Sequence, residues 1–411
     1  MKADIDRLMS SRGLDAIVVQ GPDGLGAVNA PFNYLVKGQH LTGNVIKLRG
    51  RAPQLLFGSM ERLQAEATGL DLVPMSTWNV PEIMKKHADR LSAAAELWRQ
   101  IFQTLGVRGR VGWYGVGESG AFLAMVERLK PIAPDVHVVG EYEKGVIDEA
   151  RRTKDAEEIA MLADVGRRAA EIVRNVIAFI AAHRAADEVV VDADKRPVKI
   201  GDVKAFIRRE LDRLALDHPE PVIFAQGRDA GIPHANGDDA APLRVGETIV
   251  FDFFPKDRSN GYYHDMTRTF CIGHATPDAQ RVYDDVRAVF DLIMSSLNVG
   301  QRSRHYQDVT CAELAKRGHK TPEKHWPLEE GYCHSLGHGL GLEVHEPMAF
   351  SSFVDRGDVL EPGSVFTIEP GLYYPDRKIG VRIEDTVAVM PDGAIRSLTP
   401  APYDLVIPLR G

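Results

Sequence analysis

The chain has 411 residues, of which 44% are hydrophobic and 26% charged, and its formal net charge is −8. This length exceeds one typical folding core, so two domains are expected. The acidic balance argues against a nucleic-acid-binding protein, and no apolar run approaches the roughly 20 residues that span a bilayer. Residues 1–6 lack the apolar core of a secretory signal, and the three cysteines have no CxxC spacing, which together favour a cytoplasmic location.

The first part of the chain alternates helical and strand-like patterns, which predicts an α/β domain over residues 1–147. The expected elements are a helix over 3–12, a strand over 15–20, a hairpin from 44–48 and 54–57, a helix over 80–105 and a strand over 110–114. Residues 115–120 match the GxGxxG dinucleotide fingerprint, but the next acidic candidate, Glu141, already leads out of the domain. We therefore interpret this motif as a tight turn into a helix.

A charged segment over 151–162 opens a second expected domain, residues 148–411, with a long helix through Ile180 and Thr153 as its N-cap. The patterns then predict a loop or small hairpin over 184–202, a helix over 204–216, a strand over 221–225, an antiparallel pair from 247–254 and 262–272, helices over 278–297 and 304–317, and strands over 365–369 and 381–389. The fold class is therefore mixed α/β.

Four acidic residues stand in strand-like segments of the second domain. Asp252, Glu369 and Glu384 interrupt apolar runs, and Asp265 lies on a mixed strand. A buried carboxylate is costly unless it is paired or bound to metal, and no matching set of buried Lys or Arg is visible. Oxygen ligands with one imidazole suit two divalent cations such as Mn²⁺, Co²⁺ or Fe²⁺, whereas Mg²⁺ prefers oxygen alone.

The imidazole comes from the stretch over 333–346, Cys-His-Ser-Leu-Gly-His-Gly-Leu-Gly-Leu-Glu-Val-His-Glu. It holds His334, His338 and His345, with glycines between them that allow close backbone approach. Elsewhere His264 is expected to be structural, because it points away from the face of its neighbour Asp265. Three other histidines, His305, His319 and His325, have no ligand spacing and are expected at the surface. Neither HExxH nor GxSxG occurs.

With these motifs the second domain resembles the pita-bread metallopeptidases, the family of methionine aminopeptidase, aminopeptidase P and prolidase. The resemblance is strong over about 145–400, while the first domain is more loosely similar to the N-terminal domain of prolidases, aminopeptidases P and creatinases. The metal ligands that the resemblance implies are Asp252, Asp265, His338, Glu369 and Glu384. The cofactor expected from it is a pair of divalent cations, Mn²⁺ first and otherwise Co²⁺, Fe²⁺ or Zn²⁺.

The resemblance also implies roles in catalysis. A hydroxide bridging the two cations attacks the carbonyl before the cut, with Glu369 as proton shuttle. His345 and His234 stabilise the oxyanion and hold the substrate, and His334 lines the pocket for the residue after the cut. Arg382, two residues before Glu384, is expected to orient a ligand carboxylate, Asp252. A surface position for Arg382 is the alternative.

One departure from the family pattern lies between the two aspartates. Phe254 stands where the family usually has glycine, and Asp252 and Asp265 are 13 positions apart (265 − 252) instead of the family's eleven. An even insertion keeps the same side chains on each strand face, so metal binding is expected to survive. Phe253 or Phe254 is expected to narrow the substrate cleft.

The function implied is a metal-dependent exopeptidase of the prolidase type, an Xaa-Pro dipeptidase whose peptide substrate has proline after the cut. Aminopeptidase P, acting on longer Xaa-Pro peptides, is the first alternative. A dipeptidase needs a cation for the substrate's free carboxylate, for which Arg377 and Lys378 are unranked candidates. A creatinase-like hydrolase or a non-catalytic pita-bread binding protein is a weaker alternative, because all five ligands are present. The resemblance implies a homodimer, with neither nucleic acid nor membrane as a partner.

Overall fold

The protein forms two units, Met1–Arg151 and Arg152–Gly411, each with its own hydrophobic core. A computed structural model describes residues 4–410 except 23–28, 143 and 326, so residue 3, the expected start of the first helix, lies outside the described residues. Both units combine helices and sheets, which confirms the mixed α/β class.

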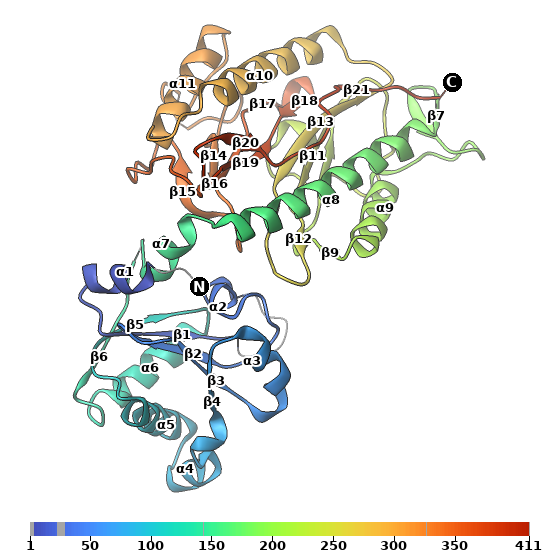
Figure 1. Ribbon diagram of the computed structural model, residues 1–411. Helices are drawn as coiled ribbons and strands as arrows, with labels where there is room; N and C mark the ends of the chain where they lie inside the picture. Colours follow the sequence, from blue (N-terminus) through green and yellow to red (C-terminus); the bar gives the residue numbers. More distant parts are fainter. Residues whose placement is uncertain (1–3, 23–28, 143, 326, 411) are drawn as a thin grey trace. The chain divides into compact units, whose positions relative to one another are not determined.

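The first unit is built on one mixed sheet of six strands in the order β4-β3-β2-β1-β5-β6. The expected hairpin is present as the antiparallel pair β2 and β3, while β5 runs parallel to β1 and β6 (Figure 1). The strands are β1 (Ala16–Gln20), β2 (Asn44–Leu48), β3 (Gln54–Phe57), β4 (Asp71–Pro74), β5 (Gly109–Tyr114) and β6 (Val136–Val139). The α-helices are α1 (Ile5–Ser11), α2 (Ala30–Val36), α3 (Arg62–Thr68), α4 (Val80–Lys86), α5 (Arg90–Leu105) and α6 (Ser119–Leu129), and α7 (Val146–Arg152) spans the unit boundary.

Two details of the first unit bear on the sequence predictions. The single helix expected over 80–105 is wrong: it divides into α4 and α5, because the Asp89 side chain accepts the Ser92 backbone N–H at 2.8 Å and starts a new helix. The glycine motif turns into α6 as interpreted. Glu118 accepts the N–H groups of Gly120 and Ala121, so a protein carboxylate occupies the helix end where a phosphate would bind.

The second unit contains two sheets, each covered by its own pair of helices (Figure 1). One sheet has the order β10-β11-β13-β21 and shares a core with α8 and α9; the other has the order β15-β14-β16-β19-β20 and packs on α10 and α11. The helices are α8 (Ala156–Ala181), α9 (Ile200–Arg213), α10 (Pro277–Ser296) and α11 (Ser303–Lys316). The strands of the two sheets are β10 (Ile223–Gln226), β11 (Thr248–Phe253), β13 (Met266–Ile272), β14 (Gly337–Gly339), β15 (Glu346–Phe350), β16 (Val365–Ile368), β19 (Asp385–Val389), β20 (Ile395–Ser397) and β21 (Val406–Ile407).

Three short antiparallel ribbons complete this unit. They are β7 (Arg184–Ala186) with β8 (Val189–Val191), β9 (Leu216–Asp217) with β12 (Lys256–Asp257), and β17 (Gly371–Tyr374) with β18 (Ile379–Arg382). The lengthened turn after Asp252 is therefore held by backbone pairing, because part of it forms β12, which pairs with β9.

Several expectations for the second unit need correction. Helix α8 is capped by Asp155 in a full capping box with Glu158, not by Thr153. The segment expected as one strand over 381–389 is divided, with Glu384 between β18 and β19. His319 is not a free surface residue, since its ring contacts the Tyr374 hydroxyl and the Asp285 carboxylate.

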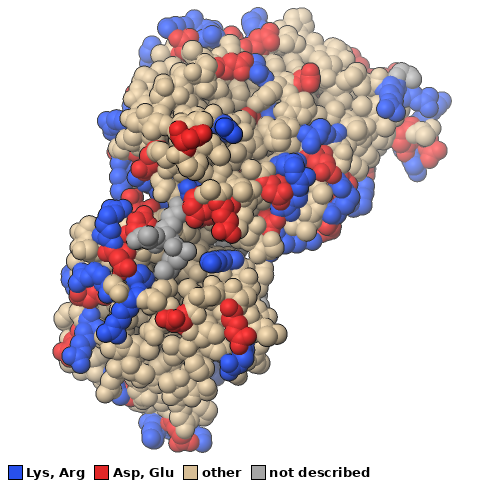
Figure 2. Space-filling model, in the orientation of Figure 1, with Lys and Arg blue, Asp and Glu red and all other residues tan. Residues whose placement is uncertain are grey.

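On the face shown in Figure 2, basic and acidic side chains are interspersed in both units, without an extended basic patch among the described residues in view. Among the described residues, every helix is too short or too polar to cross a bilayer.

Candidate metal centre

Strands β11 and β13 bring the two aspartates together. Asp252 lies near the end of β11 and pairs in register with Thr267 on β13. Asp265 directly precedes β13, so it is a strand-end residue and not a mid-strand one as expected. Its backbone is fixed by Thr386, whose hydroxyl accepts the Asp265 N–H at 3.2 Å and donates to the Asp265 carbonyl at 2.8 Å.

His338 reaches the site from the middle of β14, a strand of three residues in the second sheet. A Cβ on Gly337 would lie 1.9 Å from the Thr367 carbonyl oxygen, so only glycine permits this strand to approach β16. The imidazole Nδ1 lies 3.1 Å from the Gly339 carbonyl, to which it donates a proton. The other ring nitrogen, Nε2, is then an unprotonated ligand atom, as metal-binding histidines require.

Glu369 and Glu384 each lie just beyond the end of a strand in the second unit. Glu369 follows β16, and its N–H donates to the Leu336 carbonyl at 2.8 Å. Glu384 accepts the Thr267 hydroxyl at 2.7 Å, which joins it to β13, the strand that Asp265 directly precedes. Each ligand candidate is thus held by a backbone or hydroxyl contact before any cation binds.

The donor atoms converge as a metal site requires. One ligand atom each from Asp265, His338 and Glu384 lies within 4.8 Å of the other two. His338 Nε2 is 3.4 Å from Glu369 Oε1 and 3.6 Å from Asp265 Oδ2, although an unprotonated nitrogen has no proton to share with either oxygen. Asp265 Oδ1 is buried without a hydrogen-bond partner. A cation bound here would satisfy all of these lone pairs, so the residues fit a divalent metal.

The raised pKa values of the buried carboxylates also indicate a site for a cation. Burial raises the pKa of Asp265 well above its usual value, and the charges of Asp252 and Glu369 raise it further. Burial, followed by the neighbouring carboxylates, raises the pKa of Glu384 in the same way. Burial also raises the pKa of Glu369 to about 7, against the opposing charge of Arg382. These carboxylates repel one another until positive charge is placed among them.

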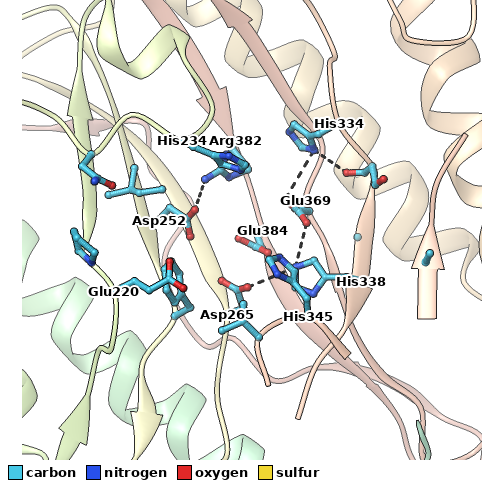
Figure 3. Close-up of a pocket in the computed structure, with 18 residues that line it drawn as sticks. Glu220, His234, Asp252, Asp265, His334, His338, His345, Glu369, Arg382 and Glu384 are labelled. Atoms are coloured by element: carbon cyan, nitrogen blue, oxygen red, sulfur yellow. Dashed lines mark hydrogen bonds and ion pairs between the residues drawn. The ribbon is translucent and has the colours of Figure 1, made fainter. Parts of the chain in front are cut away.

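Arg382 supplies part of that positive charge. Its guanidinium is buried and pairs with Asp252, as expected from the sequence (Figure 3). It also donates to the Tyr373 hydroxyl at 2.7 Å and to the Thr267 hydroxyl at 3.0 Å. A surface position for Arg382 is therefore wrong.

A cavity of about 630 Å³ contains all of the predicted site residues, including the substrate-facing histidines (Figure 3). His345 packs edge-on against His338, with ring centroids 4.3 Å apart. His334 donates from Nδ1 to the Ser335 carbonyl at 2.7 Å and accepts the Tyr373 hydroxyl at Nε2. His234 lines the same cavity. By contrast, His264 is fully buried and contacts the Thr399 hydroxyl outside the cavity lining.

The structure also places the two phenylalanines that follow Asp252, where the sequence departs from the family pattern. Phe254 lines the cavity, whereas Phe253 points into the hydrophobic core beside Phe251. Sequence reasoning missed two contributors, Glu220 on the cavity wall and Tyr373 behind it. Neither lies in a motif or at a spacing that could have indicated it.

These residues form a candidate metal pocket, and comparison with known proteins gives the class of the protein as metallopeptidase. The profile of metallopeptidase family M24 matches residues 163–391. The chain belongs to this family.

Its relatives include a "Probable dipeptidase PepE" from Mycobacterium tuberculosis, 30% identical over 285 residues that cover 68% of this chain and 67% of the relative. An "Xaa-Pro dipeptidase" from Pyrococcus furiosus is 28% identical over 297 residues, covering 72% of this chain and 73% of the relative. Among solved structures, "Xaa-Pro dipeptidase from Bacillus anthracis" superimposes with a TM-score of 0.76 at 21% identity, covering 98% of both chains. At that identity the structural likeness establishes the fold alone.

Proposed function

We propose that this protein is a metal-dependent exopeptidase that hydrolyses Xaa-Pro bonds, releasing the residue before proline. The observation that carries the proposal is the convergence of the four candidate ligand carboxylates and four histidines in one cavity of a family M24 fold. The Xaa-Pro specificity is supported by the names of the relatives described above.

In this proposal the metal ligands are Asp252, Asp265, His338, Glu369 and Glu384. Two divalent cations bound there supply Lewis acidity and a water of lowered pKa. The protein's own residues do the rest. Glu369 takes a proton from the attacking water and returns it to the leaving nitrogen. Arg382 keeps Asp252 in position and balances part of the carboxylate charge.

The three other histidines are proposed to contact different parts of the substrate. His345 and His234 donate N–H groups to the substrate carbonyl oxygen, whose negative charge grows during attack. His334 has both ring nitrogens engaged, by Ser335 and Tyr373, so it offers the substrate mainly a ring face. A flat, already satisfied ring suits the apolar pyrrolidine of proline after the cut.

The test is an assay of the metal-loaded protein on an Xaa-Pro dipeptide, an Xaa-Pro tripeptide and matched peptides with alanine in place of proline. Release of the first residue from the proline peptides, with slower or no release from the alanine peptides, is expected. Equal cleavage of both series would contradict the proline specificity. Failure to take up Mn²⁺ or Co²⁺ would favour the metal-free hydrolase or the non-catalytic alternative.

One observation favours aminopeptidase P-like action on longer peptides as a second candidate. Among the described residues lining the cavity, Arg382 is the one Lys or Arg, and Asp252 already engages it. Arg377 instead pairs with Asp278 through two nitrogens, and Lys378 lies 3.7 Å from Glu247; neither lines the cavity. The free carboxylate of a dipeptide thus meets no available cation here. Hydrolysis of the tripeptide alone would replace the dipeptidase assignment.

We also propose Mn²⁺ as the metal, a homodimer as the assembly and the cytoplasm as the location. Four carboxylates with one imidazole suit Mn²⁺ among the divalent cations. The dimer is supported by the family resemblance alone. All three cysteines are free thiols, as is usual in a reducing compartment. Metal analysis of the purified protein and its mass in solution by light scattering test the first two.

A further inference from the structure

Glu220 is an acidic residue of the cavity wall that the proposed chemistry does not use. It lies in the loop between β9 and β10, three residues before Ile223, the register partner of Asp252. Its side chain is exposed, unlike the buried Asp265 and Glu384. Figure 3 shows it on the aspartate side of the cavity, across from His338 and His345. Glu220 therefore stands at the outer part of the pocket that holds the candidate metal ligands.

The backbone at Glu220 is held by His218. The imidazole Nδ1 of His218 donates to the Glu220 carbonyl at 2.6 Å, and its Nε2 accepts the Phe254 N–H at 3.1 Å. The ring also stacks on Phe253, with an interplanar angle of 10°. The lengthened turn supports the same loop, because β12 pairs with β9 just before His218. The loop that carries Glu220 is thus supported in part by the lengthened turn, one of the features in which this chain departs from the family pattern.

The Glu220 carboxylate has no counter-charge among the described residues. It forms no ion pair with a described Lys or Arg, and the cavity's Arg382 is engaged by Asp252. His218 cannot serve as the partner, because its Nε2 accepts a backbone N–H and so carries no proton. The other cavity carboxylates are all candidate metal ligands, which bound cations would balance, and one of them, Asp252, also pairs with Arg382. Glu220 is left as a negative charge facing the substrate space.

We propose that Glu220 binds the cationic side chain of the substrate's first residue, so that the enzyme prefers Lys or Arg before the cut. This deepens the proposed function and rests on it. The α-ammonium of a substrate is two bonds from the scissile carbonyl and must lie as deep as the metal ligands. A Lys or Arg side chain extends several bonds further and reaches the outer wall, where a carboxylate gives a charge-assisted hydrogen bond.

The test compares kcat/KM of the manganese-loaded full chain for peptides that begin Arg-Pro, Met-Pro and Glu-Pro, each as dipeptide and tripeptide. In Glu220→Gln the ratio of Arg-Pro to Met-Pro hydrolysis is expected to fall about fivefold, the effect of one partly exposed ion pair. In Glu220→Lys the ratio of Glu-Pro to Met-Pro hydrolysis is expected to rise about tenfold. The second result is a gain, so misfolding cannot produce it. Glu157, exposed on α8, provides the matched controls Glu157→Gln and Glu157→Lys, which are expected to keep the wild-type ratios.

Three other outcomes would contradict either the role of Glu220 or the proposed function. Wild-type ratios in Glu220→Lys, with an active wild type, overturn this inference alone. An equal loss on every peptide assigns Glu220 to the α-ammonium and overturns the side-chain specificity. An inert wild-type protein with metal bound overturns the proposed function and this inference with it.

Discussion

At the scale of single residues, the candidate metal centre is a set of groups that are poorly satisfied without a cation. His338 turns an unprotonated nitrogen toward two carboxylates, and Asp265 keeps one buried oxygen without a partner. Such groups cost stability in the metal-free protein and are the donors that a divalent ion binds. Function and stability therefore place opposite demands on the same side chains.

The opposite effects of this carboxylate on metal binding and on stability can be measured with Asp265→Asn, which keeps the shape of the side chain and removes its charge. We expect the variant to lose bound metal and about a thousandfold or more in activity, since the chemistry depends on the cations. Without metal, however, it is expected to be about 1 kcal/mol more stable than the metal-free wild type, because repulsion from Asp252 and Glu369 is relieved. Metal analysis and urea unfolding with a chelator check both parts.

The matched control for this experiment is Asp278→Asn, an aspartate that pairs with Arg377 outside the cavity. It is expected to retain metal and activity. A metal-free Asp265→Asn protein less stable than the wild type would show that the carboxylate is satisfied in another way.

Arg382 gives a second residue-scale prediction. Its guanidinium contacts Asp252, Tyr373 and Thr267 at once, and a lysine ammonium cannot reproduce that planar geometry. Arg382→Lys is therefore expected to weaken metal affinity and to lower kcat/KM by about 10–100-fold, as for other residues that orient metal ligands. Titration with Mn²⁺ followed by activity measures both.

Arg377→Lys serves as the control for that substitution, because Arg377 forms its ion pair with Asp278 away from the cavity. If Arg382→Lys bound Mn²⁺ as tightly as the wild type, Asp252 would not depend on the guanidinium for its position.

At the scale of elements, every ligand candidate lies at or near a strand end, and short strands set the distances between them. β14 approaches β16 so closely that a methyl group at Gly337 would overlap the Thr367 carbonyl oxygen. The position of His338 therefore depends on its glycine neighbour as much as on its own side chain.

Gly337→Ala tests this dependence. We expect β14 to shift, lowering stability by about 1–3 kcal/mol and activity with it, because overpacking forces the backbone to move. The matched change is Gly140→Ala, since nothing lies within 4 Å of the added methyl group and the backbone there is not left-handed. Thermal unfolding and peptidase assays compare the two, and equal behaviour would mean that β14 can move without harm.

The sequence predicted the elements and site residues that repeat a local rule. Runs of β-branched and aromatic residues around an Asn-Gly turn predicted β11 and β13, and the family resemblance implied Asp252, His338 and Glu384, which the structure brings to one cavity. The prediction was wrong where two nearby residues satisfied the same local rule. Thr153 and Asp155 are both good N-caps, and α8 begins after Asp155, whose partner Glu158 completes the capping box.

Residues that meet only through tertiary structure could not be predicted. Tyr373 reaches Arg382 because β17 pairs with β18; Pro375-Asp376 marks the turn between these strands in the sequence, but nothing there indicates that the two side chains meet. Glu220 faces the cavity because β10 pairs with β11 and His218 holds the loop. The break between α4 and α5 likewise came from the Asp89 cap, which apolar periodicity does not record.

At the scale of the whole molecule, the chain consists of two units with separate cores, and the ligand candidates all belong to the second. We therefore expect metal removal to act on one unit. In calorimetry with a chelator, the second unit is expected to lose about 3–4 kcal/mol relative to protein in metal at 100–1,000 times the dissociation constant. The transition of the first unit is expected to stay in place.

A scan in Mg²⁺ at the same ionic strength controls for salt. An unchanged transition of the second unit on chelation would contradict the assignment of the ligands to a resident metal, whatever the enzyme's activity.

The two sheets of the second unit have one more consequence. Asp252 and Asp265 come from the first sheet, whereas His338 and the residues flanking β16 and β19 come from the second. A cation held by both sets acts as a non-covalent cross-link between segments far apart in the chain. Its affinity thus reports how well the two halves fit each other, and substitutions in the packing of either sheet, remote from every ligand, are expected to appear first as metal loss.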